Sequence, residues 1–177
     1  VFGCSGAQQV LESFPPRRAS DLARMQRLDP SVSLRLDGHE WSHFENAELV
    51  VLNPAVPPYN EFVQRFLESD KRLTSEIELF CQLNLGKVIA VTGSNGKSTT
   101  TSFIHSMLKS AGVKCWLGGN IGVSLLEHVG EIEATDWVVL ELSSFQLHSL
   151  RRIDFRPDIA VVTNLAANHL EIGRAHV

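Results

Sequence analysis

The second half of the chain alternates short apolar runs with stretches of helical periodicity. Residues 87–92, KVIAVT, form a β-branched run that ends at a glycine, which predicts a buried strand. From 97 to 111 the apolar residues recur at helical spacing, and Gly112 stands where a helix usually ends. Residues 113–117, 136–142 and 158–163 are further strand candidates. Strands separated by helical stretches predict a parallel α/β sheet.

The first half is less regular. Residues 47–52 predict a strand that a proline-rich turn ends, and residues 61–68 predict a helix. Ser75 and Glu78 have the spacing of a capping box, which predicts a short helix to about Leu83. We place a domain boundary near residues 84–86, between an N-terminal domain, 1–86, and a central domain, 87–170.

Composition narrows the class of protein. The chain has 177 residues, of which 44% are hydrophobic and 20% charged, with a net charge of -4, so it is expected to bury a core. A mildly acidic chain gives no support for a nucleic-acid partner. No apolar run approaches the roughly 20 residues that span a bilayer, and the first residues do not resemble a signal peptide. The cysteines, at 4, 81 and 115, are widely spaced and are expected to be reduced thiols of a cytosolic protein.

The stretch 92–99, TGSNGKST, follows a predicted strand and opens a predicted helix, as a phosphate-binding loop does. Glycines allow the backbone to curl so that its N–H groups face one anion, and the helix N-terminus adds positive potential. The spacing is the short GxxGK[ST] form, since Val91 stands where the longer form has glycine. The alternative is a glycine turn with an exposed lysine. The candidate ATP-binding residues are Gly93, Ser94, Asn95, Gly96, Lys97, Ser98 and Thr99.

A family resemblance then becomes specific. GSNGKST at 93–99 and GGNIG at 118–122 resemble successive motifs of the Mur ligases. ELSSFQL at 141–147 is similar to the signature of the member that adds D-glutamate, and NLAANHL at 164–170 resembles the following Asn…His-Leu motif. The resemblance covers roughly residues 34–170. Asn168 departs from it, because many members have an acid there.

The resemblance implies roles for single residues. Lys97, Glu141 and His169 would be catalytic, and Ser98, Glu141 and His169 would hold Mg2+. The implied contacts with the UDP-linked substrate are Asn120, Ser143, Gln146, Asn53 and Ser5. The alternatives are a solvated strand-end acid for Glu141, a surface histidine for His169 and polar packing for the others. Ser5 lies in GCSG at 3–6, which resembles the uridine-diphosphate turn of the family over four residues only.

The implied fold is α/β: an incomplete Rossmann-like N-terminal domain, then the first part of a P-loop parallel-sheet central domain. The implied reaction uses ATP and Mg2+ to join D-glutamate to UDP-N-acetylmuramoyl-L-alanine through an acyl phosphate, in peptidoglycan precursor synthesis. The resemblance implies a cytoplasmic monomer that acts on small molecules, with neither nucleic acid nor membrane as a partner. Residues 171–177 resemble a translated sequencing adapter, so we expect a non-native tail and a truncated, inactive central domain. A natural ending in a loop is the alternative for these residues.

Other functions stay open at this stage. The chain could be a fragment that binds nucleotide or UDP without catalysis, a sister Mur ligase, or an unrelated P-loop phosphotransferase. The string HEWSH at 39–43 matches the zinc-protease pattern HExxH. That pattern requires a helix and a third ligand. A strand is predicted a few residues later and no third ligand presents itself, so a solvated loop is the expected structure.

Overall fold

The computed structural model describes residues 10–11, 33–34, 40–53, 56, 59–122 and 124–166. The chain divides into two compact units, Val1–Thr74 and Ser75–Val177. Each unit is described by itself. None of the helices described is long and apolar enough to cross a membrane.

The second unit is built on a four-stranded parallel sheet in the order β6-β7-β5-β8. Its strands are β5 (Lys87–Thr92), β6 (Cys115–Gly119), β7 (Trp137–Glu141) and β8 (Ile159–Val162). These are the strands predicted for this half of the chain: β5 has the predicted ends, β7 and β8 are one residue shorter at each end, and β6 starts and ends two residues later. The prediction of a parallel α/β sheet is confirmed.

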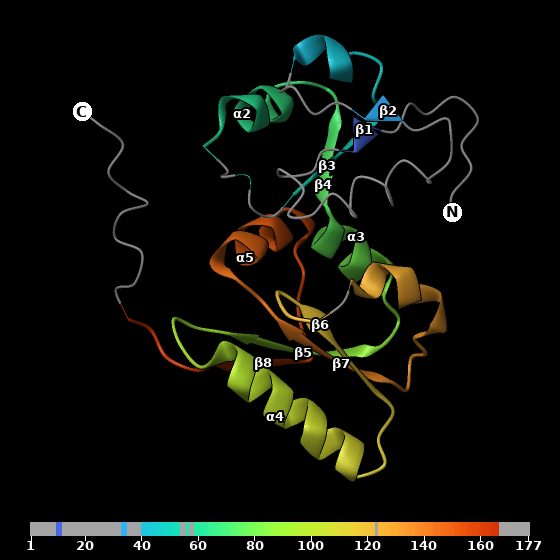
Figure 1. Ribbon diagram of the computed structural model, residues 1–177, viewed down its shortest axis with the longest axis vertical. Coiled ribbons are helices and arrows are strands. Elements are labelled where there is room, and N and C mark those ends of the chain that lie inside the picture. Colours follow the sequence, from blue (N-terminus) through green and yellow to red (C-terminus); the bar gives the residue numbers. More distant parts are fainter. Residues whose placement is uncertain are drawn as a thin grey trace. The chain divides into compact units, whose positions relative to one another are not determined.

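Helices cover both faces of this sheet (Figure 1). Helix α4 (Lys97–Ser110) packs on one face, where Ile104 and Leu108 contact the alternate residues Ile89 and Val91 of β5. The other face is covered by α3 (Glu76–Leu83), the 3-10 helix η2 (Leu125–Glu131), α5 (Ser144–Leu150) and the 3-10 turn η3 (Arg151–Ile153). Because both faces of the central strands β5 and β7 are buried, these strands are apolar along most of their length, which is why they could be recognised from short hydrophobic runs.

The predicted helix ends are also found in the structure. The Ser75 side chain accepts a hydrogen bond from the Glu78 N–H and so caps α3, and Gly112 follows α4 with a positive φ of 76°. Helix α5 was not predicted.

The division between the compact units falls before Ser75, N-terminal to the predicted boundary at 84–86, because Ile77 and Phe80 of α3 pack in the core of the second unit.

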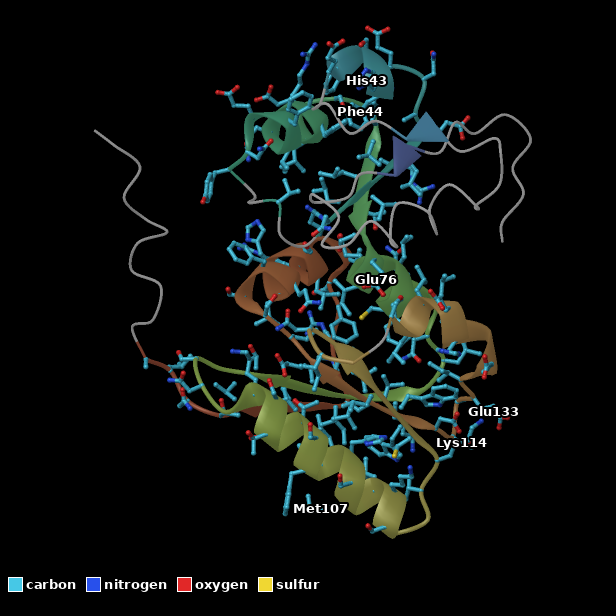
Figure 2. All side chains as sticks on the ribbon, viewed as in Figure 1. His43, Phe44, Glu76, Met107, Lys114 and Glu133 are labelled. Atoms are coloured by element: carbon cyan, nitrogen blue, oxygen red, sulfur yellow. The ribbon has the colours of Figure 1, made fainter. Side chains whose placement is uncertain are left out.

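Polar contacts join two strands of the second unit's sheet at its amino edge, where the strands begin; Lys114 and Glu133 of this edge are labelled in Figure 2. The Asp136 carboxylate, which immediately precedes β7, accepts a hydrogen bond from Trp116 Nε1 at 2.9 Å. Lys114 lies between Asp136 and Glu133, at 3.0 Å and 3.5 Å from their oxygens. These contacts join the start of β6 to the start of β7.

The first unit has a smaller core. Strands β3 (Leu49–Leu52) and β4 (Arg72–Ser75) form a two-stranded sheet, and α2 (Glu61–Leu67) and the 3-10 helix η1 (Trp41–Phe44) supply the aromatic core residues Phe44, Phe66 and Trp41. The predicted strand at 47–52 and helix at 61–68 are confirmed. A separate parallel pair joins β1 (Val10–Leu11) and β2 (Ser33–Leu34).

Candidate functional site

Three parallel strands end together at the carboxyl edge of the sheet. Val91 of β5 pairs with Glu141 of β7, and Gly119 of β6 pairs with the same Glu141. The segments that follow these strands therefore begin at one level. Ligands of open parallel sheets bind at this edge.

The loop between β5 and α4 has the conformation that its glycines were expected to provide. Gly93 has a φ of 138° and Gly96 a φ of 78°, and Gly96 is the N-cap of α4. The first N–H groups of a helix have no acceptor within the helix, and they carry partial positive charge. Thr101, fully buried, donates to the Lys97 carbonyl at 2.8 Å and anchors this first turn. The loop and helix start therefore form a preformed position for an anion.

Lys97 is folded back over its own loop. Its Nζ donates to the Gly93 carbonyl at 2.7 Å and to the Ser94 carbonyl at 3.3 Å. Both acceptors are neutral, and hydrogen bonds from an ammonium to a charged oxygen are stronger than those to a neutral one. The ammonium therefore lies against the loop, where phosphate oxygens can replace its carbonyl acceptors.

Glu141 is the buried acid of the site, with 1% of its surface exposed. Asn120 Nδ2 donates to its Oε1 at 3.0 Å. Its Oε2 is buried and has no hydrogen-bond partner within the described part of the chain. A buried carboxylate oxygen left unpaired costs free energy. The arrangement is what a hard oxygen ligand for a divalent cation requires, so the residue fits Mg2+.

Two glycines at the end of β6 allow close packing, Gly119 against Glu141 and Gly118 against Leu125. A Cβ added at Gly119 would collide with the Glu141 carbonyl oxygen, and Gly119 has a φ of 93°. A Cβ at Gly118 would lie 2.5 Å from Leu125 Cγ. The Asn120 N–H also donates to the Glu141 carbonyl at 2.8 Å. The Gly-Gly-Asn sequence therefore holds the end of β6 tightly against the end of β7.

The Ser143 and Gln146 side chains form a helix cap in this structure. The Gln146 N–H donates to Ser143 Oγ at 3.2 Å, and the Ser143 N–H donates to Gln146 Oε1 at 2.9 Å. Gln146 is buried, with 3% exposed. The two residues thus fix the start of α5 directly after Glu141. Their contact with a substrate stays a prediction. The S-x-x-Q spacing of a capping box was a signal that could have identified α5 from the sequence.

The structure does not bring all the expected residues together. His169 and Ser5 lie outside the described residues, so the predicted metal role of His169 and substrate role of Ser5 stay predictions. Asn53 is exposed in the first unit, while Ser98 and Thr99 are exposed on the first turn of α4. No group of three or more His, Cys, Asp or Glu side chains placed to hold a metal occurs in the described ranges. Residues 40–43 of the HEWSH string do not form the α-helix that the zinc-protease pattern requires. Glu40 and His43 instead cap the short 3-10 helix η1, Trp41–Phe44.

In the segment that follows β8, a role was predicted for His169 but none for Thr163 or Asn164, yet these two residues contact the loop. The Thr163 hydroxyl donates to the Asn95 carbonyl at 2.6 Å. Asn164 Oδ1 accepts from the Asn95 N–H at 3.1 Å, and Asn164 Nδ2 donates to the Asn95 carbonyl at 2.9 Å. The positions of these two residues depend on the pairing of β8 with β5, so local sequence could not reveal the contact.

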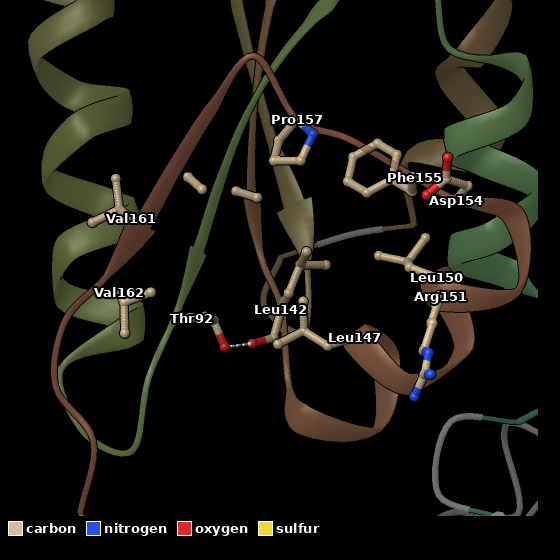
Figure 3. Close-up of a pocket in the computed structure, with 12 residues that line it drawn as sticks. Thr92, Leu142, Leu147, Leu150, Arg151, Asp154, Phe155, Pro157, Val161 and Val162 are labelled. Atoms are coloured by element: carbon tan, nitrogen blue, oxygen red, sulfur yellow. Dashed lines mark hydrogen bonds between the residues drawn. The ribbon is translucent and has the colours of Figure 1, made fainter.

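A pocket of about 350 Å³ lies on the α5 face of the sheet, beside β8 (Figure 3). Its wall is mostly apolar, with Leu142, Leu147 and Phe155 among its residues. Thr92 Oγ1 donates to the Leu142 carbonyl at 2.9 Å at one side of it. Neither Lys97 nor Glu141 lines this pocket, so the pocket does not include the two charged residues of the candidate site.

Comparison with known proteins assigns the family. A sequence profile of the Mur ligase middle domain matches residues 91–175, which include the loop and Glu141. A protein of Ruminiclostridium cellulolyticum, named UDP-N-acetylmuramoylalanine–D-glutamate ligase, is 40% identical over 175 residues, 99% of this chain and 35% of that protein. The chain belongs to the Mur ligase family.

Other relatives carry the same name. The protein of Acetivibrio thermocellus is 53% identical over 108 residues, which cover 61% of this chain and 22% of that protein. The protein of Geobacillus kaustophilus is 38% identical over 168 residues, which cover 94% of this chain and 36% of that protein. The chain thus spans about a third or less of the length of these Mur ligases.

Proposed function

We propose that the complete protein carrying this sequence is an ATP-dependent ligase that joins D-glutamate to UDP-N-acetylmuramoyl-L-alanine. The observation that carries the proposal is that Glu141 Oε2, which is buried and has no hydrogen-bond partner among the described residues, lies at the same sheet edge as the loop of Lys97. The substrate pair rests on the names of the relatives and on the similarity of residues 141–147 to a family signature.

In this proposal the loop and the start of α4 bind the phosphates of ATP. The N–H groups at the helix start donate to phosphate oxygens, and Lys97 supplies a full positive charge. The terminal phosphoryl group passes to the alanine carboxylate of the substrate and forms an acyl phosphate. The D-glutamate amine then attacks the acyl carbon, and phosphate leaves. Lys97 stabilises the charge on the transferring group, because phosphoryl transfer depends mainly on positioning and electrostatics.

Glu141 and Ser98 would hold Mg2+, with His169 as a further proposed ligand. When bound, the ion offsets the negative charge of the phosphates. The remaining residues act through position: Asn120 orients the Glu141 carboxylate, and the cap formed by Ser143 and Gln146 fixes the start of α5 next to it. Direct substrate contacts by Asn120, Ser143, Gln146, Asn53 and Ser5 belong to the same proposal. We propose further that the enzyme is a cytoplasmic monomer of peptidoglycan synthesis.

The metal role is tested by Glu141→Gln in a protein of the relatives' full length. Glutamine keeps the size of the side chain and an acceptor for Asn120, but it removes the charge. We expect the Mg2+ concentration for half-maximal activity to rise about tenfold or more. The measurement is a Mg2+ titration of phosphate release from ATP.

Glu133→Gln is the matched control, because Glu133 is an exposed acid of the same unit, at the opposite edge of the sheet (Figure 2). Its Mg2+ titration should equal that of the wild type. If the Glu141→Gln titration also equals the wild-type titration, Glu141 is not a metal ligand and the proposed site is wrong.

A further inference from the structure

The segment after β8, residues 163–166, runs along the phosphate loop and is hydrogen-bonded to it at two successive loop residues. We call it the β8 extension. Ser94 N–H donates to the Asn164 carbonyl at 3.0 Å. Ser94 Oγ donates to the Ala166 carbonyl at 2.9 Å and accepts from the Ala166 N–H at 2.8 Å. The extension is therefore joined to the loop through both backbone and side chains.

The Asn164 side chain binds both backbone polar groups of Asn95, its N–H and its C=O. Its Oδ1 accepts from the Asn95 N–H at 3.1 Å and its Nδ2 donates to the Asn95 carbonyl at 2.9 Å. An asparagine amide can satisfy one donor and one acceptor at once, which aspartate or leucine cannot do. The Asn164 side chain thus determines the direction of the Asn95 N–H and C=O groups.

The glycine at 93 shows how closely the extension approaches. A Cβ added at Gly93 would collide with Thr163 Oγ1 and would lie 2.9 Å from the Asn164 carbonyl oxygen. Gly93 also has a φ of 138°, which L residues rarely adopt. The first loop residue therefore lacks a side chain both because of its backbone conformation and because the extension occupies that space.

The N–H groups of the loop and those of the helix start therefore differ in whether they already have an acceptor. Those of Ser94 and Asn95 donate to Asn164, and so they are already used. The N–H groups at the start of α4 have no acceptor within the helix. The anion position is thus formed by the helix start, while the first half of the loop is held from outside by the extension.

From this geometry we infer that Asn164 is a positioning residue of the phosphate loop, which it holds in the conformation that binds the phosphates of a nucleoside triphosphate. The inference rests on the proposed function, since it needs the loop to bind ATP. Asn164 acts through Asn95 and is not itself in contact with the ligand in this account. Preorganisation of this kind raises affinity because the loop need not be ordered on binding.

The test compares Asn164→Ala with the wild type in a protein of the relatives' full length. We expect the Kd for ATP, measured by calorimetry with Mg2+, to rise about tenfold, the effect of losing hydrogen bonds that preorganise a site. Amide hydrogen exchange without nucleotide should become faster at Ser94 and Asn95. Exchange at Val139, in the buried sheet, should not change.

Leu165→Ala is the matched control, since Leu165 is the next residue of the extension and is 88% exposed. It should leave both the Kd and the exchange rates at wild-type values. If Asn164→Ala does not fold, Asn164→Leu decides the question: it nearly keeps the size of the side chain but removes both of its hydrogen bonds to Asn95. We expect it to raise the Kd for ATP about tenfold.

An unchanged Kd for ATP in Asn164→Ala, with faster exchange at Asn95, would mean that the contact is only structural, and would overturn the inference alone. An unchanged Kd in a folded Asn164→Leu would overturn it in the same way. A wild-type protein that binds no ATP at all would overturn the proposed function, and this inference with it.

Discussion

Lys97 is held at the loop by two neutral carbonyl oxygens, so its charge has no ionic partner among the contacts described for it. Lys97→Ala in a protein of the relatives' full length should reduce phosphate release from ATP by about 100-fold or more, because a preorganised charge at the transferring group is lost. The fold should survive, since the lysine contributes only to its own loop. The readouts are phosphate release and a thermal melt.

Lys109→Ala is the control for that substitution. Lys109 is an exposed lysine in the last turn of the same helix, α4. Its removal should leave phosphate release within about twofold of the wild type, since surface changes rarely act at a distance. Equal activity in Lys97→Ala and Lys109→Ala would refute the role assigned to Lys97.

Cys81 is expected to be an unreactive thiol. Burial raises its pKa from 9.0 to about 12, and the Glu76 and Glu78 carboxylates add to the rise. Only the thiolate is nucleophilic, so Cys81 should react slowly with iodoacetamide at pH 8 and rapidly after unfolding in urea. Between pH 9 and about 12 the unfolded chain loses this proton while the folded chain keeps it, so stability should fall as the pH rises through that range.

Peptide mapping after alkylation measures this residue directly. Cys81→Ala is the matched comparison for the pH effect, because its stability should fall less steeply over the same range. Alkylation of Cys81 at the same rate in the folded and unfolded chain would contradict the burial described.

At the scale of elements, α3 is joined to the segment after α5 by a buried ion pair. Arg152 Nε donates to Glu78 Oε1 at 3.0 Å and its terminal nitrogen donates to Oε2 at 2.6 Å. Glu78 is 1% exposed, so Arg152→Ala leaves a buried carboxylate without this cation. The free energy of unfolding should fall by about 3 kcal/mol, measured by urea denaturation.

Arg156→Ala provides the comparison. Arg156 pairs with Asp154 at 3.2 Å, but both side chains are more than 80% exposed, at 81% and 83%. Such a pair contributes about 0–1 kcal/mol. A loss for Arg152→Ala no larger than that for Arg156→Ala would mean that the α3 contact does not stabilise the unit.

The elements show how far the sequence could predict the structure. Strands β5 and β7 were predictable because a strand buried on both faces is apolar throughout. Strand β8 was predictable because it is a short apolar run as well, although most of its residues are exposed. Helix α5 has seven residues and an apolar pattern too short to indicate a helix by itself. Its signal was the cap formed by Ser143 and Gln146, two residues for which only substrate contact or polar packing had been expected.

The candidate site was predictable to the extent that it is local. The loop at 93–99 could be identified from its own residues. The burial of Glu141 and the contact of Asn164 with Asn95 could not, because they depend on which strands pair. Val91 lies between Glu141 on β7 and Val161 on β8, an order that no local pattern encodes.

At the scale of the whole molecule, the described sheet has an apolar edge at β8, where Ile159 is 45% and Val162 56% exposed. The pocket of Figure 3 adjoins this strand on the α5 face. Exposed apolar edges favour association with other chains. Since the relatives from Ruminiclostridium cellulolyticum and Geobacillus kaustophilus are about three times as long as the part that matches, we expect ligase activity to need residues beyond those of the 177-residue chain.

The central claim is that this loop and sheet edge form the ATP site of a D-glutamate-adding ligase. The most direct test is phosphate release from ATP by a protein of the relatives' full length, with UDP-N-acetylmuramoyl-L-alanine and D-glutamate added singly and together. We expect turnover only with both substrates, none when L-alanine replaces D-glutamate, and turnover lower by about 100-fold or more in Lys97→Ala. Comparable turnover with L-alanine, or with the longer dipeptide precursor in place of UDP-N-acetylmuramoyl-L-alanine, would contradict the central claim.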